Sequence, residues 1–287
     1  MQTKNYINES IPSLLVEKIP VQKHKLNEGI SDYWNGLLLW RLWIYMAVAD
    51  IRRRYRLTLI GPFWTTLSLA IFILCMSYLF ATLWHNDIKT FMPYFSAGYI
   101  CWILIATTIT EGCTTFISAE GLLKQIELPY STFAWVVVTR NFLVFLHQIF
   151  IFILVALVFQ VQPTLNTLLI IPGLILFFFS ASWLAILAGL LCARFRDAQQ
   201  VVASLLQISI FLTPVFWPVN QLEPGMRTSI LINGNPLYHY LSLIRQPMLG
   251  QAPEFISWVI VASIAILGWF ITMNVLSKKY KSLIFWL

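Results

Sequence analysis

Six long runs of apolar residues dominate the chain, and each is long enough to cross a lipid bilayer as a helix. A spanning helix needs about 20 predominantly apolar residues. Four of the six runs contain no Asp, Glu, Lys or Arg at all. The runs cover residues 57–84, 91–117, 133–159, 168–192, 198–219 and 255–277. We therefore predict an all-α integral membrane protein with six transmembrane helices.

The overall composition supports a membrane location for the chain. Hydrophobic residues make up 59% of the 287 residues and charged residues only 11%, whereas a soluble domain carries roughly 25% charge. The net charge of +7 would suggest nucleic acid in a soluble protein. Here the basic residues flank the apolar runs, so we interpret them as orientation signals and contacts with membrane lipid, and expect no nucleic-acid partner.

The distribution of Lys and Arg predicts which side of the membrane each segment faces. Suppose that the polar segment 1–31 is cytoplasmic. Of the 19 Lys and Arg residues, Lys89, Arg227 and Arg245 then face outward, Arg140 is intramembrane, and the other fifteen face the cytoplasm. This bias places both termini in the cytoplasm. Segment 1–31 shows no signal-peptide pattern, and we assign it no further role.

Two segments outside the six runs favour unusual membrane elements. Residues 32–50 are rich in Trp and too short in apolar length to span, which predicts an amphipathic interface helix lying along the membrane; a partly spanning or buried helix is the alternative. Residues 222–250 are rich in Pro and Gly. They are typical of short re-entrant helices that dip into the outer leaflet, or of an ordinary periplasmic loop.

Two ionisable residues inside the apolar runs are expected to pair. Glu111 lies near the end of the second run and Arg140 near the start of the third. These runs are antiparallel, so both side chains sit roughly 10 Å into the membrane at 1.5 Å of rise per residue. Charged groups at this depth are costly unless they are paired. A structural ion pair is the preferred interpretation over a proton relay that also includes His147.

The segment 119–129, which joins the second and third runs, has the spacing of a short amphipathic helix that Pro129 ends. Its apolar side chains Leu122, Leu123, Ile126 and Leu128 would form a stripe on the cytoplasmic side. Such a stripe favours a protein partner, with packing on lipid headgroups as the alternative.

No catalytic motif accompanies these features. The sequence contains no phosphate-binding G-x-x-x-x-G-K-[ST] loop, no H-E-x-x-H and no G-x-S-x-G. We therefore expect no enzyme activity, no metal site and no cofactor in this chain.

Several segments, in this order, resemble one family. Residues 50–64 read DIRRRYRLTLIGPFW, the connector contains LLKQIELP, and residues 193–197 read ARFRD. Residues 212–218 read LTPVFWP and are followed by NPLYH at 235–239. Together these motifs resemble the ABC-2 type permeases that export polysaccharides, over roughly residues 32–287. One departure is Ile60, which stands where the family pattern has Leu.

The resemblance implies a transport subunit in a bacterial inner membrane. It implies a homodimer driven by two copies of a separate cytoplasmic ATPase, which would bind ATP and Mg. The implied cargo is an undecaprenyl-pyrophosphate-linked, O-antigen-type polysaccharide. Segment 119–129 would be the coupling helix that contacts the ATPase, through Leu122, Leu123, Lys124, Gln125, Ile126, Leu128 and Pro129.

The resemblance also suggests where the cargo would touch the chain. The lipid pyrophosphate would meet Arg52, Arg53, Arg54 and Arg56, which are otherwise positive-inside anchors. Sugar rings would slide on Tyr94, Phe95, Tyr99 and Trp102, which otherwise form an interfacial aromatic belt. The periplasmic gate would involve Asn235, Pro236, Tyr238 and His239.

Three alternative functions stay open at this point. The chain could export another cargo, such as capsule, teichoic acid, a drug or a lipid. It could be a polytopic membrane enzyme acting on lipid carriers, although no acidic pair converges at one membrane face. It could be a secondary transporter, although we find no internal repeat.

Overall fold

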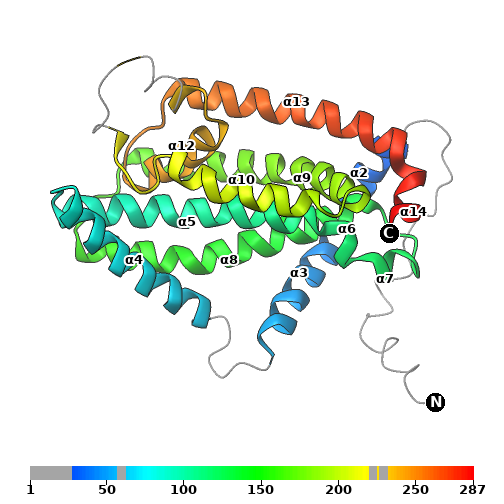
Figure 1. Cartoon of the computed structure of the whole chain (residues 1–287), viewed down its shortest axis with the longest axis horizontal. Coiled ribbons are helices and arrows are strands. Elements are labelled where there is room, and N and C mark those ends of the chain that lie inside the picture. Colours follow the sequence, from blue (N-terminus) through cyan, green and yellow to red (C-terminus); the bar gives the residue numbers. More distant parts are fainter. Residues whose placement is uncertain (1–27, 57–62, 220–224, 226–231) are drawn as a thin grey trace.

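The computed structural model describes residues 28–56, 63–219, 225 and 232–287, and all regular secondary structure within them is helical. Five helices are long and apolar enough to cross a membrane, and they lie side by side in an elongated bundle (Figure 1). They are α4 (Phe63–Leu83), α5 (Ile88–Cys113), α8 (Tyr130–Val158), α9 (Ile170–Arg194, preceded by the 3-10 turn Leu165–Leu169) and α13 (Phe255–Lys279). The predicted all-α membrane fold is therefore confirmed.

The fifth predicted run, 198–219, forms a shorter helix than expected. Its helix α10 (Ala198–Leu212) has 15 residues, which span only about 22 Å at 1.5 Å per residue. Thr213 adopts extended backbone (φ −89°, ψ 136°), because the residue before a proline is disfavoured in the helical region. Pro214 therefore ends the helix, and residues 213–219 continue as turns.

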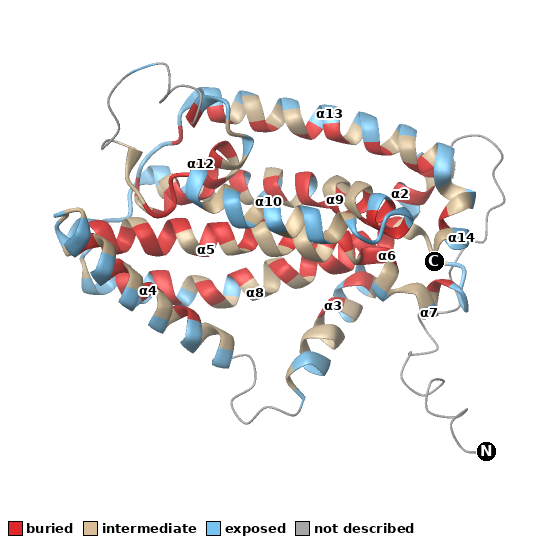
Figure 2. Ribbon diagram, viewed as in Figure 1, coloured by how far each residue is buried: buried red, intermediate tan, exposed pale blue. Residues whose placement is uncertain are grey.

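Helix α5 is the central element of the bundle. It packs against α4, α8, α9 and α12 (Pro236–Met248). Its side chains Phe95, Ile100 and Leu104 are almost completely buried. Figure 2 shows the buried residues concentrated in the middle of the bundle, whereas α4, α10 and α13 expose most of their surfaces. Those exposed surfaces are mostly apolar, as expected for helices that face lipid or another subunit.

Small residues let α9 approach two neighbours closely. A Cβ atom on Gly112 would lie 3.1 Å from Ala185 Cα, and one on Gly189 would lie 2.9 Å from the Phe116 ring. On the other face of α9, a Cβ atom on Gly173 would lie 2.7 Å from the Leu243 carbonyl oxygen. These contacts fix α9 between α5 and α12.

Because the atom that opposes Gly173 belongs to the backbone of α12, we expect Gly173→Ala to lower the melting temperature by several degrees. The overpacking cost is about 1–3 kcal/mol. Thermal unfolding in detergent, followed by size-exclusion chromatography, measures it. Gly121→Ala is the control, since nothing lies within 4 Å of its added Cβ. Equal melting temperatures for the two variants would contradict the close contact.

The predicted interface helix 32–50 is two helices, α2 (Glu28–Leu38) and α3 (Trp40–Tyr55), with a break at Leu39. One face packs on α8, where Tyr33 and Trp43 lie against Trp135. The opposite face exposes Trp34, Leu38 and Trp40. The two helices therefore pack on the bundle with one side and expose apolar side chains on the other.

The predicted coupling helix 119–129 is also shorter than expected. Helix α6 (Thr115–Ser118) and helix α7 (Glu120–Leu123) have four residues each, and the chain then turns without regular structure to Pro129. The chain ends in a 3-10 turn (Tyr280–Ser282) and α14 (Leu283–Trp286). Parts of three predicted segments lie outside the described residues: 1–27, the start of the first run at 57–62, and 220–224 with 226–231 in the gate segment.

Candidate functional site

The structure brings Glu111 and Arg140 together at the end of the bundle where α5 meets α6. Arg140 donates two hydrogen bonds to Glu111 Oε2, from Nη2 at 2.8 Å and from Nε at 3.2 Å. The two side chains are only 14% and 21% exposed, Arg140 being the more buried. A two-pronged contact of this kind is among the stronger ion-pair geometries.

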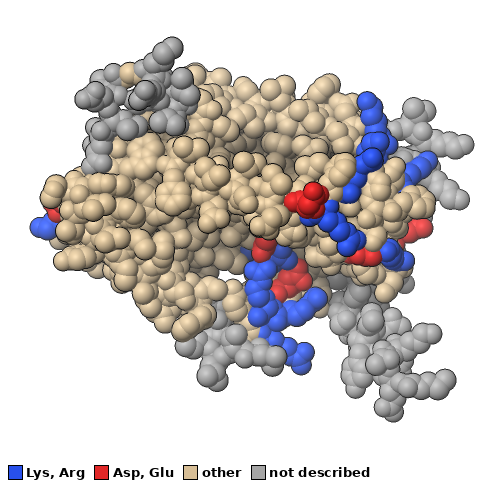
Figure 3. Space-filling view, in the orientation of Figure 1, with Lys and Arg blue, Asp and Glu red and all other residues tan. Residues whose placement is uncertain are grey.

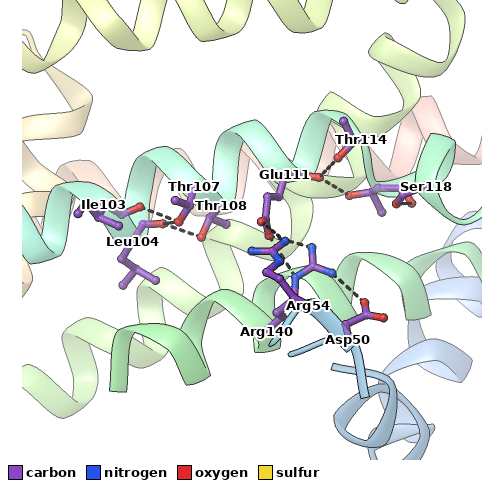
Figure 4. Close-up of polar contacts among 11 residues, drawn as sticks. Asp50, Arg54, Ile103, Leu104, Thr107, Thr108, Glu111, Thr114, Ser118 and Arg140 are labelled. Atoms are coloured by element: carbon purple, nitrogen blue, oxygen red, sulfur yellow. Dashed lines mark hydrogen bonds and ion pairs between the residues drawn. The ribbon is translucent and has the colours of Figure 1, made fainter. Parts of the chain in front are cut away.

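Two further charged residues join this pair, and both come from α3 (Figure 4). Arg140 Nη1 donates to Asp50 Oδ2 at 2.8 Å, and Arg54 Nη2 donates to Glu111 Oε1 at 2.8 Å. The hydrogen bond to Glu111 raises the pKa of Arg54 above its ordinary value. We call Asp50, Arg54, Glu111 and Arg140 the ionic cluster. It ties α3 to both α5 and α8.

The sequence pattern does not predict Asp50 and Arg54 as partners of this pair. Asp50 stands at the end of the predicted interface helix, and Arg54 is one of four neighbouring arginines. His147, the other candidate on α8, lies apart from the cluster: its Nδ1 is 2.6 Å from Thr66 Oγ1, and its ring contacts Phe63. No carboxylate is hydrogen-bonded to His147 in the part of the chain that the structure describes.

The coupling segment exposes a different set of residues from the one expected. Leu123 is 6% exposed and belongs to the core, so the prediction of an outward-facing Leu123 is wrong. Lys124, Gln125 and Ile126 are exposed, and Lys124 Nζ pairs with Glu120 Oε1 at 2.6 Å. Leu122, Leu128 and Pro129 are half-buried. The outward surface is thus a small polar turn with Ile126 as its apolar element.

Asp32 joins α2 to the start of α8, which directly follows the coupling segment. Its carboxylate accepts hydrogen bonds from Tyr130 N at 2.6 Å and Ser131 N at 2.9 Å, the first amides of α8. The Ser131 hydroxyl donates in return to the Asp32 carbonyl at 2.8 Å. Because Asp32 is almost fully buried, loss of hydration raises its pKa from 3.8 to about 6, even though these hydrogen bonds act in the opposite direction. Sequence reasoning did not single out this residue.

The predicted gate residues hold α12 in place. Asn235 caps this helix: its Oδ1 accepts from Leu237 N, and its Nδ2 donates to Thr213 Oγ1 at 3.0 Å. Pro236 occupies the first turn, where its missing N–H costs nothing. His239 is fully buried and hydrogen-bonds Ser257 of α13 at 2.9 Å. Tyr238, 4% exposed, is also core.

A buried arginine that the sequence did not flag lies beside these residues. Arg245 of α12 is 2% exposed. Its Nη1 donates to Tyr94 Oη at 2.9 Å and to the Pro214 carbonyl at 2.6 Å, and its guanidinium lies 4.4 Å from the centre of the Tyr94 ring. No carboxylate in the described segments forms an ion pair with it. Arg245 therefore links α12, α5 and the turn after α10.

Comparison with known proteins identifies this helical chain. A family model described as ABC-2 type transporter matches residues 41–249, which include the ionic cluster, the coupling segment and α12. The chain belongs to the ABC-2 type transporter family. It is a multi-pass membrane permease subunit without an ATPase domain, and membership of the family implies a partner ATPase subunit.

Curated relatives of this permease are distant. One is the O-antigen export system permease protein RfbA of Myxococcus xanthus, 25% identical over 205 residues, which cover 71% of this chain and 76% of the relative. Another is the O-antigen export system permease protein RfbA of Klebsiella pneumoniae, 23% identical over 213 residues, covering 73% and 80%.

The aromatic residues expected to contact cargo divide into two groups in the permease. Phe95 is fully buried and Trp102 is 4% exposed, so both are core residues of the single chain, and their contact with cargo stays a prediction. A second subunit could only bury Phe95 and Trp102 further. Tyr94 and Tyr99 are half-buried; the Tyr99 ring stacks on Phe72 at 4.6 Å.

The four arginines also divide. Arg54 is held by Glu111, and Arg53 lies 3.4 Å from Asp50 while remaining 79% exposed. Arg52 and Arg56 are exposed, and neither forms an ion pair with a described residue. Of the four arginines, these two therefore keep a guanidinium that no described carboxylate neutralises. Among the described residues, no group of three or more His, Cys, Asp or Glu side chains is placed to hold a metal ion.

Proposed function

We propose that this permease exports an undecaprenyl-pyrophosphate-linked, O-antigen-type polysaccharide from the cytoplasm to the periplasm of a bacterial cell. The observation that carries the proposal is the alignment with O-antigen export permeases over about 70% of this chain, at 25% and 23% identity. Those relatives are named for that cargo. The positions of the charged residues, the exposed apolar helices and the aromatic residues are compatible with export of that cargo.

The charge distribution supports a cytoplasmic location for the end of the bundle that carries α3 and α14. Figure 3 shows Lys and Arg side chains gathered around α3 and the region near α14, whereas most of the remaining length of this face carries none. We call this the basic end of the bundle. Loops rich in Lys and Arg stay on the cytoplasmic side, so the basic end faces the cytoplasm and α12 faces the periplasm.

The exposed surface of α10 supports assembly as a homodimer. None of its 15 residues is buried in the single chain, although ten of them are apolar. α4 likewise buries only four of its residues. A second copy of the chain would cover such surfaces, and the wide path that a sugar chain needs would lie between the copies.

The coupling surface is proposed to be the turn formed by Lys124, Gln125 and Ile126, which would dock on the partner ATPase. We expect Ile126→Asp to abolish ATP-linked export and weaken co-purification of the ATPase at least tenfold. The melting temperature should fall only slightly, because Ile126 is 37% exposed and lies outside the buried core. Ile126→Val is the control and should behave as the original chain. Normal export and ATPase binding by Ile126→Asp would remove this turn from the coupling surface.

Transport into inverted membrane vesicles tests the cargo. Vesicles that contain the permease and its ATPase should take up polyprenyl-pyrophosphate-linked polysaccharide only when ATP is supplied. Arg52→Gln with Arg56→Gln should raise the cargo concentration needed for half-maximal uptake, because their guanidinium groups match phosphate geometry. Uptake of capsular, teichoic-acid or drug substrates in place of this cargo would contradict the proposal while leaving family membership intact.

A further inference from the structure

An open apolar pocket lies at the basic end of the bundle, between α9 and α13. Its volume is about 400 Å³, within the range of ligand sites. The walls are formed by Leu187, Leu190 and Leu191 of α9 and by Val275 of α13. Leu191 is half exposed. The pocket belongs neither to the ionic cluster nor to the coupling turn.

Two basic residues stand at one end of this pocket. Arg194 follows Leu187 by seven residues on α9, or roughly 10 Å along the helix, and Lys279 follows Val275 by four residues on α13, or roughly 6 Å. Both helices end there. The apolar side chains of the pocket therefore lie toward the middle of the membrane, and its two basic side chains lie at the membrane surface.

The two cations are available for a ligand. Neither Arg194 nor Lys279 forms an ion pair with any residue that the structure describes, and both are exposed. The Arg194 guanidinium lies 5.3 Å from the centre of the Trp286 ring and 5.4 Å from that of Phe195. These rings hold the guanidinium over the pocket by cation–π contact. Trp286 also lines the pocket, as an aromatic residue does at headgroup depth.

We propose that this pocket binds an anionic phospholipid of the cytoplasmic leaflet. One acyl chain would lie along the leucine wall, and the phosphate would meet Arg194 and Lys279. The combination decides the class of ligand: a free anion needs no apolar wall, and an uncharged lipid needs no paired cations. Basic pockets between transmembrane helices on the cytoplasmic side are suited to acidic headgroups.

The charge of the lipid is the first test. Native mass spectrometry of the full-length permease would compare phosphatidylglycerol with phosphatidylcholine at equal concentrations. We expect retained phosphatidylglycerol and little phosphatidylcholine. Changing Arg194→Gln together with Lys279→Gln should weaken phosphatidylglycerol binding roughly thirtyfold, since each basic residue near an anionic surface contributes on the order of 1 kcal/mol. Lys278→Gln, on the same helix but outside the pocket, should leave binding unchanged.

The apolar wall is the second test. Leu191→Trp fills the pocket without changing its charge, so it should reduce binding of phosphatidylglycerol while the melting temperature of the lipid-free permease is kept. Excess inorganic phosphate should not displace the lipid. Equal retention of the two lipids, full displacement by phosphate, or unchanged binding in both the double arginine–lysine variant and Leu191→Trp would overturn the proposal. None of these results depends on which cargo the permease moves.

Discussion

Replacing Arg140 by Gln is expected to destabilise the permease more than any other single change in the ionic cluster, by about 3–5 kcal/mol. The substitution leaves the partly buried Glu111 carboxylate with the half-exposed Arg54 as its one described ion-pair partner. Asp50 keeps only the longer contact with the exposed Arg53. A loss of this size lowers the melting temperature by roughly 10 °C in a chain of this length. Thermal unfolding of the purified permease in detergent or nanodiscs measures it.

Two companions make this result specific. Arg53→Gln removes a surface cation of the same helix, 79% exposed and 3.4 Å from Asp50, and should change stability by less than about 1 kcal/mol. The double variant Arg140→Gln with Glu111→Gln should be more stable than the sum of the single losses predicts, because no carboxylate of α5 is then left unpaired. Strictly additive losses would mean that the two side chains do not stabilise each other.

Replacing Asp32 by Ala should undock α2 from α8 and cost about 2–4 kcal/mol, because two buried amides of α8 lose their acceptor. Asp87→Ala is the matched control. Asp87 also caps a helix, accepting from Lys89 N at 3.0 Å, but it is exposed, and its loss should cost only about 1 kcal/mol. Proteolysis of the α2 region should rise for Asp32→Ala and not for Asp87→Ala.

The cost of Asp32→Ala should depend on pH in a defined direction. The native pKa of Asp32, about 6, is higher than its ordinary value of 3.8, so between these values the folded chain binds more protons than the unfolded chain. Stability contributed by this residue therefore falls as the pH rises from 4 to above 6. The difference in melting temperature between the original chain and Asp32→Ala should be larger at pH 5 than at pH 7.5; the opposite trend would contradict the raised pKa.

The sequence was sufficient for five of the six predicted spans and for one ion pair. Apolar length alone located all five long helices, because a helix in lipid must satisfy its backbone internally and therefore needs an uninterrupted run. Glu111 and Arg140 could be paired from their depth in antiparallel helices. This reasoning works because both residues lie on regular helices, where sequence position translates directly into height.

The rest depended on tertiary packing, which periodicity does not report. Leu123 and Ile126 have the same spacing pattern, yet one is core and the other exposed. Asp32 is 98 residues from its partner Tyr130, and Arg245 is 151 residues from Tyr94. Predicting contacts between residues so far apart in the sequence requires knowing how the helices are arranged, and not only that they form. The breaks at Leu39 and after Leu123 likewise occur where short-range spacing predicted continuous helices.

The short helix α10 has a consequence for the order in which the chain assembles. The length of α10 is roughly 22 Å, which is less than the thickness of about 30 Å of a hydrocarbon layer. The irregular backbone that follows would cover the remainder. There the carbonyls of Pro214 and Trp217 receive their donors from Tyr94, and Pro214 also from Arg245. Those donors belong to helices made earlier and later in the sequence than α10. The backbone after α10 therefore reaches its final form only after α5 and α12 have met, and it should be the last part of the bundle to gain protection from hydrogen exchange during folding.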